Sequence, residues 1–266
     1  MPELPEVETI KRQLEKSIKG KIITGVIVNN AKVIKEPSLD LFKKRIKGAK
    51  IENILRKGKA LIFELSSGKS LVVHLRMTGQ LVYPGNGKKS RISFKLSDNR
   101  FLDYNDRRIL GELRLLDDWR NLKFIRELGP EPYDLTEEEF SIMLSQKKTK
   151  IKPLLMDQTF ISGIGNLYAA EALFKARINP QRHASSLSEK ESKKLFISIK
   201  EILDAATKHR GSSVDQYVTA SGEKGDYARF HKVYDRLGEP CYVCKSPIKR
   251  VSLGGRGTYF CARCQK

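Results

Sequence analysis

The spacing of hydrophobic positions divides this chain into a strand-rich first half and a helix-rich second half. Between Lys21 and about Asp117, β-branched residues and alternating apolar positions predict strands. Glycine, asparagine and aspartate at Gly68 and at residues 85–87 and 98–99 mark turns. The clearest predicted strands cover residues 22–28, 60–65, 71–75, 92–96 and 112–116. We expect a mainly antiparallel arrangement of two sheets with helices at its edge.

Helical spacing appears first at the N-terminus. One face of a predicted helix there carries Val7, Ile10, Leu14 and Ile18. A second, short helix is predicted over residues 38–47, because Ser38 is a favoured cap and a glycine follows the segment.

The pattern changes after residues 129–132, which read Gly-Pro-Glu-Pro. Thr136 with Glu139, and Ser188 with Glu191, have the spacing of capping boxes at helix starts. Further along, one helical stripe carries Leu195, Ile199, Ile202 and Leu203. We therefore predict three domains: a two-sheet domain over residues 1–132, a helical domain over residues 133–237 and a small module over residues 238–266.

Composition and charge narrow the class of partner. The 266 residues include 51 Lys and Arg against 31 Asp and Glu, a formal net charge of +20. Such a field attracts polyanions, so nucleic acid is the expected partner. A membrane surface is the alternative, but the chain has no long basic amphipathic stretch with a wide aromatic face. Neither a signal peptide nor an apolar run of bilayer length is present, so a cytoplasmic location is expected.

All four cysteines lie near the end of the chain. Cys241 and Cys244 form one C-x2-C pair, and Cys261 and Cys264 form another. This spacing is specific for a four-cysteine, closed and therefore structural zinc site. Two disulfides would need an oxidising compartment, which nothing in the sequence indicates. Two short strands over residues 248–252 and 257–260 would make a zinc-ribbon hairpin, with Arg256 at its tip as a phosphate contact or a solvated loop residue.

The N-terminal segment 1–6 reads Met-Pro-Glu-Leu-Pro-Glu. Removal of Met1 would expose the secondary amine of Pro2, and α-amino groups titrate at about 7.7–8.0. A partly neutral amine beside the carboxylates of Glu3 and Glu6 suits imine formation and proton transfer. The same residues also make an ordinary acidic helix start, and the two interpretations are compatible.

A second candidate site is the segment 159–171, which contains Gly163-Ile164-Gly165-Asn166. Two glycines ahead of a helix that Asn166 would cap expose N–H groups at a positive helix end, which suits phosphate. A plain helix–turn–helix connection is the alternative. Lys152 and neighbouring lysines add positive charge or are simply solvated.

Three motifs together resemble one family: Pro-Glu-Leu-Pro-Glu at the N-terminus, Gly-Ile-Gly-Asn-Leu-Tyr-Ala-Ala-Glu-Ala-Leu in the middle, and the paired C-x2-C motifs followed by Gln-Lys at the end. The chain resembles the bacterial formamidopyrimidine-DNA glycosylases, which remove oxidised purines such as 8-oxoguanine, over essentially its whole length. The resemblance implies an α+β multidomain fold: a β-sandwich flanked by helices, a helix-two-turns-helix domain and a zinc ribbon. It also implies damaged duplex DNA bound across the cleft between the halves and one structural zinc. The sequence shows no sign of obligate oligomerisation, so a monomer is expected.

The resemblance also assigns chemistry to residues. Pro2 would attack C1′ of the damaged nucleotide, expel the base, form a Schiff base and drive β- and δ-elimination at the abasic site. Glu3 would act as general acid and base, and Glu6 would support and orient the site. Lys59 aligns with a lysine that contacts phosphate beside the lesion, with Lys57 as the alternative.

The family fills the gap left by the flipped base with three side chains. Met77 and Arg108 match two of them by motif, and Leu110 stands where the family usually has Phe. Leucine can still wedge between bases but loses aromatic stacking. Taken alone, Met77 would more simply be a core residue, and Arg108 would more simply form a surface ion pair. Further phosphate contacts would come from Lys152, Asn166, Tyr234 and Arg256.

A polar loop over residues 221–227, expected after a helix near residues 213–218, corresponds to the family's mobile cover over 8-oxoguanine. A disordered surface loop is the alternative. A sister group that excises oxidised pyrimidines is disfavoured by Leu4, where that group usually has Gly. A non-catalytic zinc-ribbon protein would leave Pro2 without a role. A catalytic zinc hydrolase is least favoured, because the four histidines show no ligand spacing.

Overall fold

The structure is a computed structural model that describes residues 1–214 and 216–266. It consists of two compact units. The first contains Met1–Arg126 and Thr207–Ala228, and the second contains Glu127–Ala206 and Arg229–Lys266. Within the described residues, no helix is both long and apolar enough to span a membrane.

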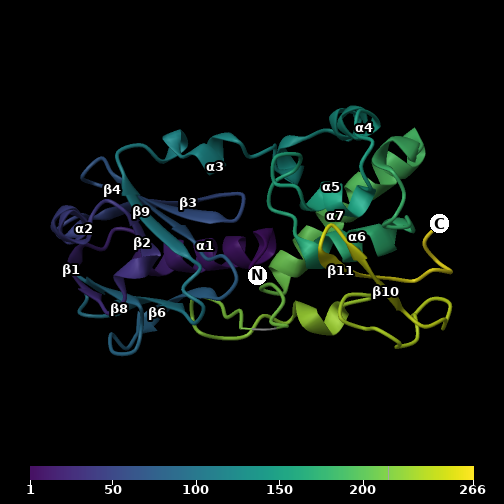
Figure 1. Cartoon of the computed structure of the whole chain (residues 1–266). Coiled ribbons are helices and arrows are strands. Elements are labelled where there is room, and N and C mark those ends of the chain that lie inside the picture. Colours follow the sequence, from purple (N-terminus) through teal and green to yellow (C-terminus); the bar gives the residue numbers. More distant parts are fainter. Residues whose placement is uncertain (215) are drawn as a thin grey trace. The chain divides into compact units, whose positions relative to one another are not determined.

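Two sheets form the body of the first unit (Figure 1). The strand orders are β1-β7-β8-β6 and β2-β9-β5-β4-β3, and every pair is antiparallel except β2 with β9. The expected two-sheet, mainly antiparallel arrangement is therefore confirmed. The strands are β1 Ile23–Val28, β2 Ile34–Glu36, β3 Ile51–Lys57, β4 Ala60–Leu65, β5 Ser70–His74, β6 Gly79–Gly85, β7 Ile92–Leu96, β8 Phe101–Asp106 and β9 Glu112–Leu116.

The first helix, α1 (Leu4–Ile18), anchors the N-terminus to this body. Its apolar face is buried in the core and contacts β3, β4 and β6. Glu3 and Glu6 form a capping box at its start, in which each side chain accepts the other residue's backbone N–H. The N-terminal segment is thus held by both packing and capping. Two further helices, α2 (Leu39–Ile46) and α3 (Lys123–Arg126), complete the unit.

Several strands were absent from the sequence prediction. In β8 the carboxylates of Asp103 and Asp106 are buried, which removes the polar–apolar alternation that identifies a strand. Strand β6 contains Pro84 and glycines at both ends, residues that normally indicate a turn. Strand β5 starts one residue earlier than predicted, at Ser70, and ends at His74.

Four helices form most of the second unit: α4 Glu137–Ser145, α5 Ile151–Met156, α6 Asn166–Ala176 and α7 Glu189–Lys208. The capping boxes at Thr136 and Ser188 are present, with the Thr136 hydroxyl accepting the Glu139 N–H at 3.2 Å. Helix α6 is buried along almost its whole length, whereas α7 buries the one face that the sequence indicated.

The C-terminal hairpin consists of β10 (Lys249–Leu253) and β11 (Arg256–Phe260). Gly254 and Gly255, at φ 56° and 70°, form its two-residue turn, a conformation that favours glycine at both positions. Arg256 is therefore the first residue of β11, paired with Leu253, and not part of the turn itself.

Segment 207–228 packs with the first unit, although the sequence placed it in the helical domain. No helix occurs among residues 211–214 and 216–220, so the helix predicted near residues 213–218 is wrong for the positions that are described. The segment is instead held by side-chain to backbone hydrogen bonds, such as that from the Ala220 N–H to Gln13 Oε1 at 2.8 Å.

Candidate functional site

The residues predicted to be catalytic gather at the start of α1. Pro2 directly precedes the capping box, and Glu3 and Glu6 are only 5% and 3% exposed. Glu6 uses both carboxylate oxygens: Oε2 accepts the Glu3 N–H at 2.8 Å, and Oε1 accepts the Ser212 N–H at 2.8 Å. Gly211 lies so close that a Cβ there would be 2.7 Å from Glu6 Oε1. The start of α1 is therefore held both by its own cap and by residues 211–212, about 200 positions away.

Lys59 joins this cluster from the turn between β3 and β4. Its side chain is buried, and burial lowers the pKa of its ammonium group, while the nearby Glu3 and Glu6 carboxylates act in the opposite direction. Lys57, the alternative, is the last residue of β3 and is half-buried. The electrostatic proximity of Lys59 to both glutamates makes it the stronger candidate.

The three predicted gap-filling residues lie on two loops of the first unit. Met77 lies between β5 and β6, and Arg108 and Leu110 lie between β8 and β9. Arg108 is exposed, and Leu110 is 43% exposed. Met77 is half-buried. Side chains of this kind on adjacent strand connections are suited to enter a base stack.

In the second unit, Lys152 and Asn166 contact each other directly. Lys152 Nζ donates to Asn166 Oδ1 at 2.6 Å, and Asn166 Nδ2 donates to the Gly257 carbonyl at 3.1 Å. The predicted capping role of Asn166 is wrong, because Gly165 occupies the cap position and Asn166 is the first helical residue. Its side chain is thereby available to join α5 to β11.

Arg256 and Tyr234 also gather around β11. Arg256 begins that strand and is exposed, while the ring of Tyr234 packs edge-on against Tyr259 with centroids 5.4 Å apart. The hairpin turn itself reaches α5, since a Cβ at Gly254 would lie 3.4 Å from Pro153 Cβ. The four predicted phosphate-binding residues of the second unit therefore lie on α5, on α6, on β11 and on the turn that carries Tyr234.

The four cysteines fit a zinc ion. Their Sγ atoms all lie within 4.8 Å of one another, with 3.9 Å between Cys241 and Cys264 and 3.4 Å between Cys244 and Cys261. A tetrahedron with Zn–S bonds of about 2.3 Å has S–S edges of about 3.8 Å. With four thiolates the coordination shell is closed, so the zinc is structural.

Comparisons with known proteins agree with this geometry along the chain. Residues 1–113 match the formamidopyrimidine-DNA glycosylase N-terminal domain, and residues 128–218 match the H2TH domain of the same enzymes. Residues 238–266 match the zinc finger found in FPG and IleRS. The chain belongs to the formamidopyrimidine-DNA glycosylase family.

Relatives in this family align over their full length. The formamidopyrimidine-DNA glycosylase of Pelotomaculum thermopropionicum is 43% identical over 100% of this chain and 99% of its own. The Solibacter usitatus enzyme is 40% identical over 100% of both chains. Among solved structures, MutM (Fpg) from Thermus thermophilus superposes with a TM-score of 0.89 at 35% identity, covering 99% of this chain and 98% of that one.

A Lactococcus lactis Fpg mutant in complex with DNA containing Fapy-dG superposes with a TM-score of 0.91 at 35% identity, covering 100% of both chains. The Lactococcus lactis Fpg complex with DNA containing an abasic site gives 0.90 at 35% identity over 99% of both chains. The α+β glycosylase fold, with its helix-two-turns-helix domain and zinc finger, is thus shown for this chain.

Sequence reasoning missed three buried polar residues that organise these sites. Glu171 on α6 is 1% exposed and accepts the backbone N–H groups of residues 232, 233 and 234 at 2.8–2.9 Å, which fixes the segment carrying Tyr234. Gln265 accepts the Cys261 N–H at 2.8 Å and fixes the second cysteine pair. Asp106 receives donors from both gap-filling loops. The sequence signal for such a residue is a single carboxylate within an apolar stretch, as at Glu171.

Proposed function

We propose that this family member excises oxidised purines, such as 8-oxoguanine and formamidopyrimidines, from duplex DNA and then cleaves the strand at the abasic site. The observation that carries the proposal is the gathering of Glu3, Glu6 and Lys59 immediately beside Pro2. The complexes of Lactococcus lactis Fpg with DNA containing Fapy-dG and with DNA containing an abasic site support the same substrate and product.

The chemistry would begin once Met1 is removed. The Pro2 secondary amine attacks C1′, the damaged base departs with its electron pair, and ring opening of the sugar gives an iminium ion. Loss of the C2′ proton then allows elimination of the 3′ phosphate, and a second elimination releases the 5′ phosphate. Glu3 would exchange protons with the sugar and base, while Glu6 orients the amine segment through its two N–H contacts.

Lys59 would bind the phosphate next to the lesion. Its depressed pKa in the free protein reflects burial, and a bound phosphate would favour the charged form. Further phosphates would be bound by Lys152, Asn166, Tyr234 and Arg256, and the gap after base flipping would be filled by Met77, Arg108 and Leu110.

The three domains expected over residues 1–132, 133–237 and 238–266 remain a proposal, as does a monomer acting at the nucleoid.

The proposal can be tested by base release. Duplexes carrying 8-oxoguanine opposite cytosine, or 5,6-dihydrouracil opposite guanine, are incubated with the protein and the free base is quantified. We expect faster release of the purine. Pro2→Gly should reduce release strongly, whereas Pro5→Ala, three positions further along and within α1, should not. Equal activity of the Pro2→Gly variant, or release of the pyrimidine alone, would contradict the proposal.

A further inference from the structure

Two loops of the first unit carry the residues proposed to fill the gap in the duplex. We call residues 75–78 the first wedge loop and residues 107–111 the second wedge loop. Each loop holds a non-glycine residue in the left-handed region, Arg76 at φ 51° and Ile109 at φ 56°, directly beside a proposed wedge residue. A positive φ is especially unfavourable for a β-branched side chain, so surrounding contacts must hold Ile109 there.

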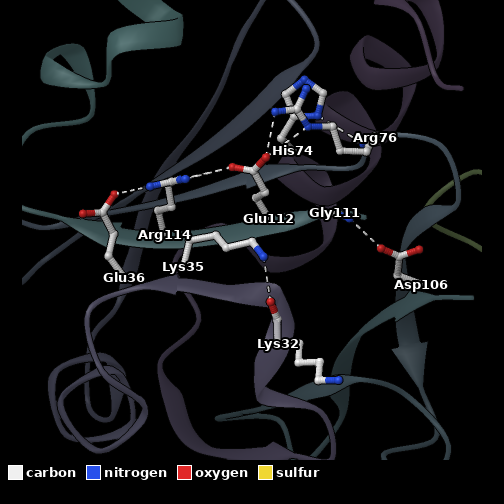
Figure 2. Close-up of polar contacts among 9 residues, drawn as sticks. All are labelled: Lys32, Lys35, Glu36, His74, Arg76, Asp106, Gly111, Glu112 and Arg114. Atoms are coloured by element: carbon white, nitrogen blue, oxygen red, sulfur yellow. Dashed lines mark hydrogen bonds and ion pairs between the residues drawn. The ribbon is translucent and has the colours of Figure 1, made fainter. Parts of the chain in front are cut away.

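The Asp106 carboxylate receives hydrogen bonds from both wedge loops. It is 2% exposed. Its Oδ1 accepts from the Thr78 hydroxyl of the first loop and from the Arg108 N–H of the second, the latter at 3.2 Å. Its Oδ2 accepts the Gly111 N–H at 2.7 Å, the contact drawn in Figure 2, and the Tyr104 hydroxyl at 3.3 Å. One buried carboxylate therefore closes the second loop and joins it to the first.

The Thr78 hydroxyl strengthens this junction. Besides donating to Asp106, it accepts the Arg108 N–H at 3.1 Å, and Thr78 is itself 5% exposed. At the end of the second loop, a Cβ on Gly111 would lie 1.8 Å from the Tyr104 hydroxyl oxygen. The close packing around Asp106 therefore depends on the residues found there, such as the glycine at position 111 beside the Tyr104 hydroxyl.

A second tether starts at the next residue, Glu112 on β9. Its Oε1 accepts a hydrogen bond from Arg76 of the first wedge loop at 2.7 Å, and its Oε2 accepts one from Arg114 at 3.0 Å (Figure 2). Arg114 also donates to Glu36 at 2.6 Å. The neighbouring residues Gly111 and Glu112 thus take part in one tether each, Gly111 through its N–H to Asp106 and Glu112 through its carboxylate to Arg76. The ion pair holds the residue immediately before Met77.

We infer that Thr78 and Asp106 are positioning residues that hold the two wedge loops as one preformed unit, so that opening of the duplex at a lesion depends on them. This inference rests on the proposed function. Neither residue would touch the reacting sugar; both act through the backbone at Arg108 and the turn that carries Met77. Their loss should therefore affect steps that require a stacked, paired duplex and spare the lyase chemistry on a single strand.

Asp103 provides a matched control on the same strand. It is 4% exposed and, like Asp106, accepts several hydrogen bonds, from Ser93 at 2.6 Å and from the N–H groups of Asn86 and Gly87 at 2.9 and 3.1 Å. These contacts organise the turn after β6, outside both wedge loops. Asp103→Asn therefore reports the general effect of disturbing a buried carboxylate in β8.

The experiment compares Thr78→Val, Thr78→Ser, Asp106→Asn and Asp103→Asn with the unmodified protein. Single-turnover excision is measured on an 8-oxoguanine:cytosine duplex, and strand cleavage is measured on a single-stranded oligonucleotide with an abasic site. We expect Thr78→Val and Asp106→Asn to lower duplex excision by about tenfold or more and to change single-strand cleavage by less than about twofold. Thr78→Ser, which keeps the hydroxyl, and Asp103→Asn should remain near the unmodified protein on both substrates.

Three results would overturn the inference: full duplex excision by Thr78→Val, equal losses in Thr78→Val and Thr78→Ser, or parallel losses on both substrates. If Asp106→Asn fails to fold, the comparison of the two Thr78 variants decides whether the inference holds. Failure of the proposed function looks different, because the unmodified protein would then be inactive on both substrates, which overturns the inference with it.

Discussion

Glu6 and Ser212 are 206 positions apart in sequence, and the Glu6 carboxylate accepts the Ser212 N–H at 2.8 Å. The other carboxylate oxygen accepts the Glu3 N–H. A single buried side chain therefore fixes both the segment after Pro2 and Ser212, which precedes by nine positions the 221–227 loop that the family resemblance identifies as the cover of the extruded base. The N-terminal segment and the segment that leads into this loop are therefore structurally linked.

Replacing Glu6 with Gln should impair both ends of this link. The amide has one acceptor oxygen, and its NH2 group would face an N–H donor, so one of the two contacts is lost. We expect base excision to fall roughly 100-fold and amide hydrogen exchange around Ser212 to rise. Glu8→Gln is the control on the same helix, because Glu8 pairs with Arg12 and Arg56 instead. Equal losses in both variants would contradict a specific role for Glu6.

The zinc site gives a second prediction. Cys244→Ser removes one of four ligands, so zinc content should fall from one ion per chain to nearly none, and duplex affinity should drop about tenfold because β11 positions Arg256. Elemental analysis and fluorescence anisotropy measure the two quantities. Lys249→Ala, an exposed change on β10, should retain zinc. A Cys244→Ser protein that keeps a full equivalent of zinc would contradict the ligand assignment.

The loss of folding stability at acidic pH should depend on His74. Burial first, and then the Arg76 charge, lower the pKa of its ring to about 4, and its Nδ1 accepts the Arg76 N–H at 3.1 Å. Since the unfolded pKa is about 6.5, the unfolded chain binds more protons between pH 6.5 and 4. The contribution of the neutral His74 ring to the free energy of unfolding is complete above pH 6.5. It is lost as the pH falls toward 4, by up to about 3 kcal/mol.

His74→Gln should therefore show a smaller loss of unfolding free energy between pH 7 and 4.5 than the unmodified protein. Urea unfolding at several pH values measures this difference. His209→Gln serves as a control in the same unit. Identical pH profiles for the His74 variant and the unmodified protein would show that the ring does not carry this dependence.

Lys152 should contribute to DNA affinity through charge. It is fully buried, and its Nζ contacts Asn166 Oδ1 and Met156 Sδ, so Lys152→Met preserves much of the packing while removing the ammonium group. We expect affinity to weaken about tenfold for every duplex sequence and the salt slope to decrease by about 1. Lys148→Ala, an exposed lysine nearby, is the control. An unchanged slope for Lys152→Met would remove Lys152 from the phosphate contacts.

The sequence predicts those features whose cause is local. Helix α1, the capping boxes at Thr136 and Ser188 and the cysteine spacing each follow from residues within one turn or one hairpin. The assignment of Pro2, Glu3 and Glu6 came from their adjacency and from the family motif. The structure adds that Lys59 shares their electrostatic environment.

Features created by distant contacts could not be predicted. Asp106 is buried because Thr78, Gly111 and Tyr104 supply donors from three different segments, and no periodicity encodes that. The packing of segment 207–228 with the first unit depends on Glu6 and Gln13, about 200 positions earlier. The contact of Asn166 with Gly257, 91 positions later, likewise requires the hairpin to be folded.

The central claim, a Schiff base on the N-terminal proline, is tested most directly by trapping. The protein is mixed with an 8-oxoguanine:cytosine duplex and sodium borohydride, and the digested product is mapped by mass spectrometry. We predict a DNA adduct on Pro2 of a chain that has lost Met1. An adduct on Lys59, or tight binding with no adduct at all, would contradict the claim.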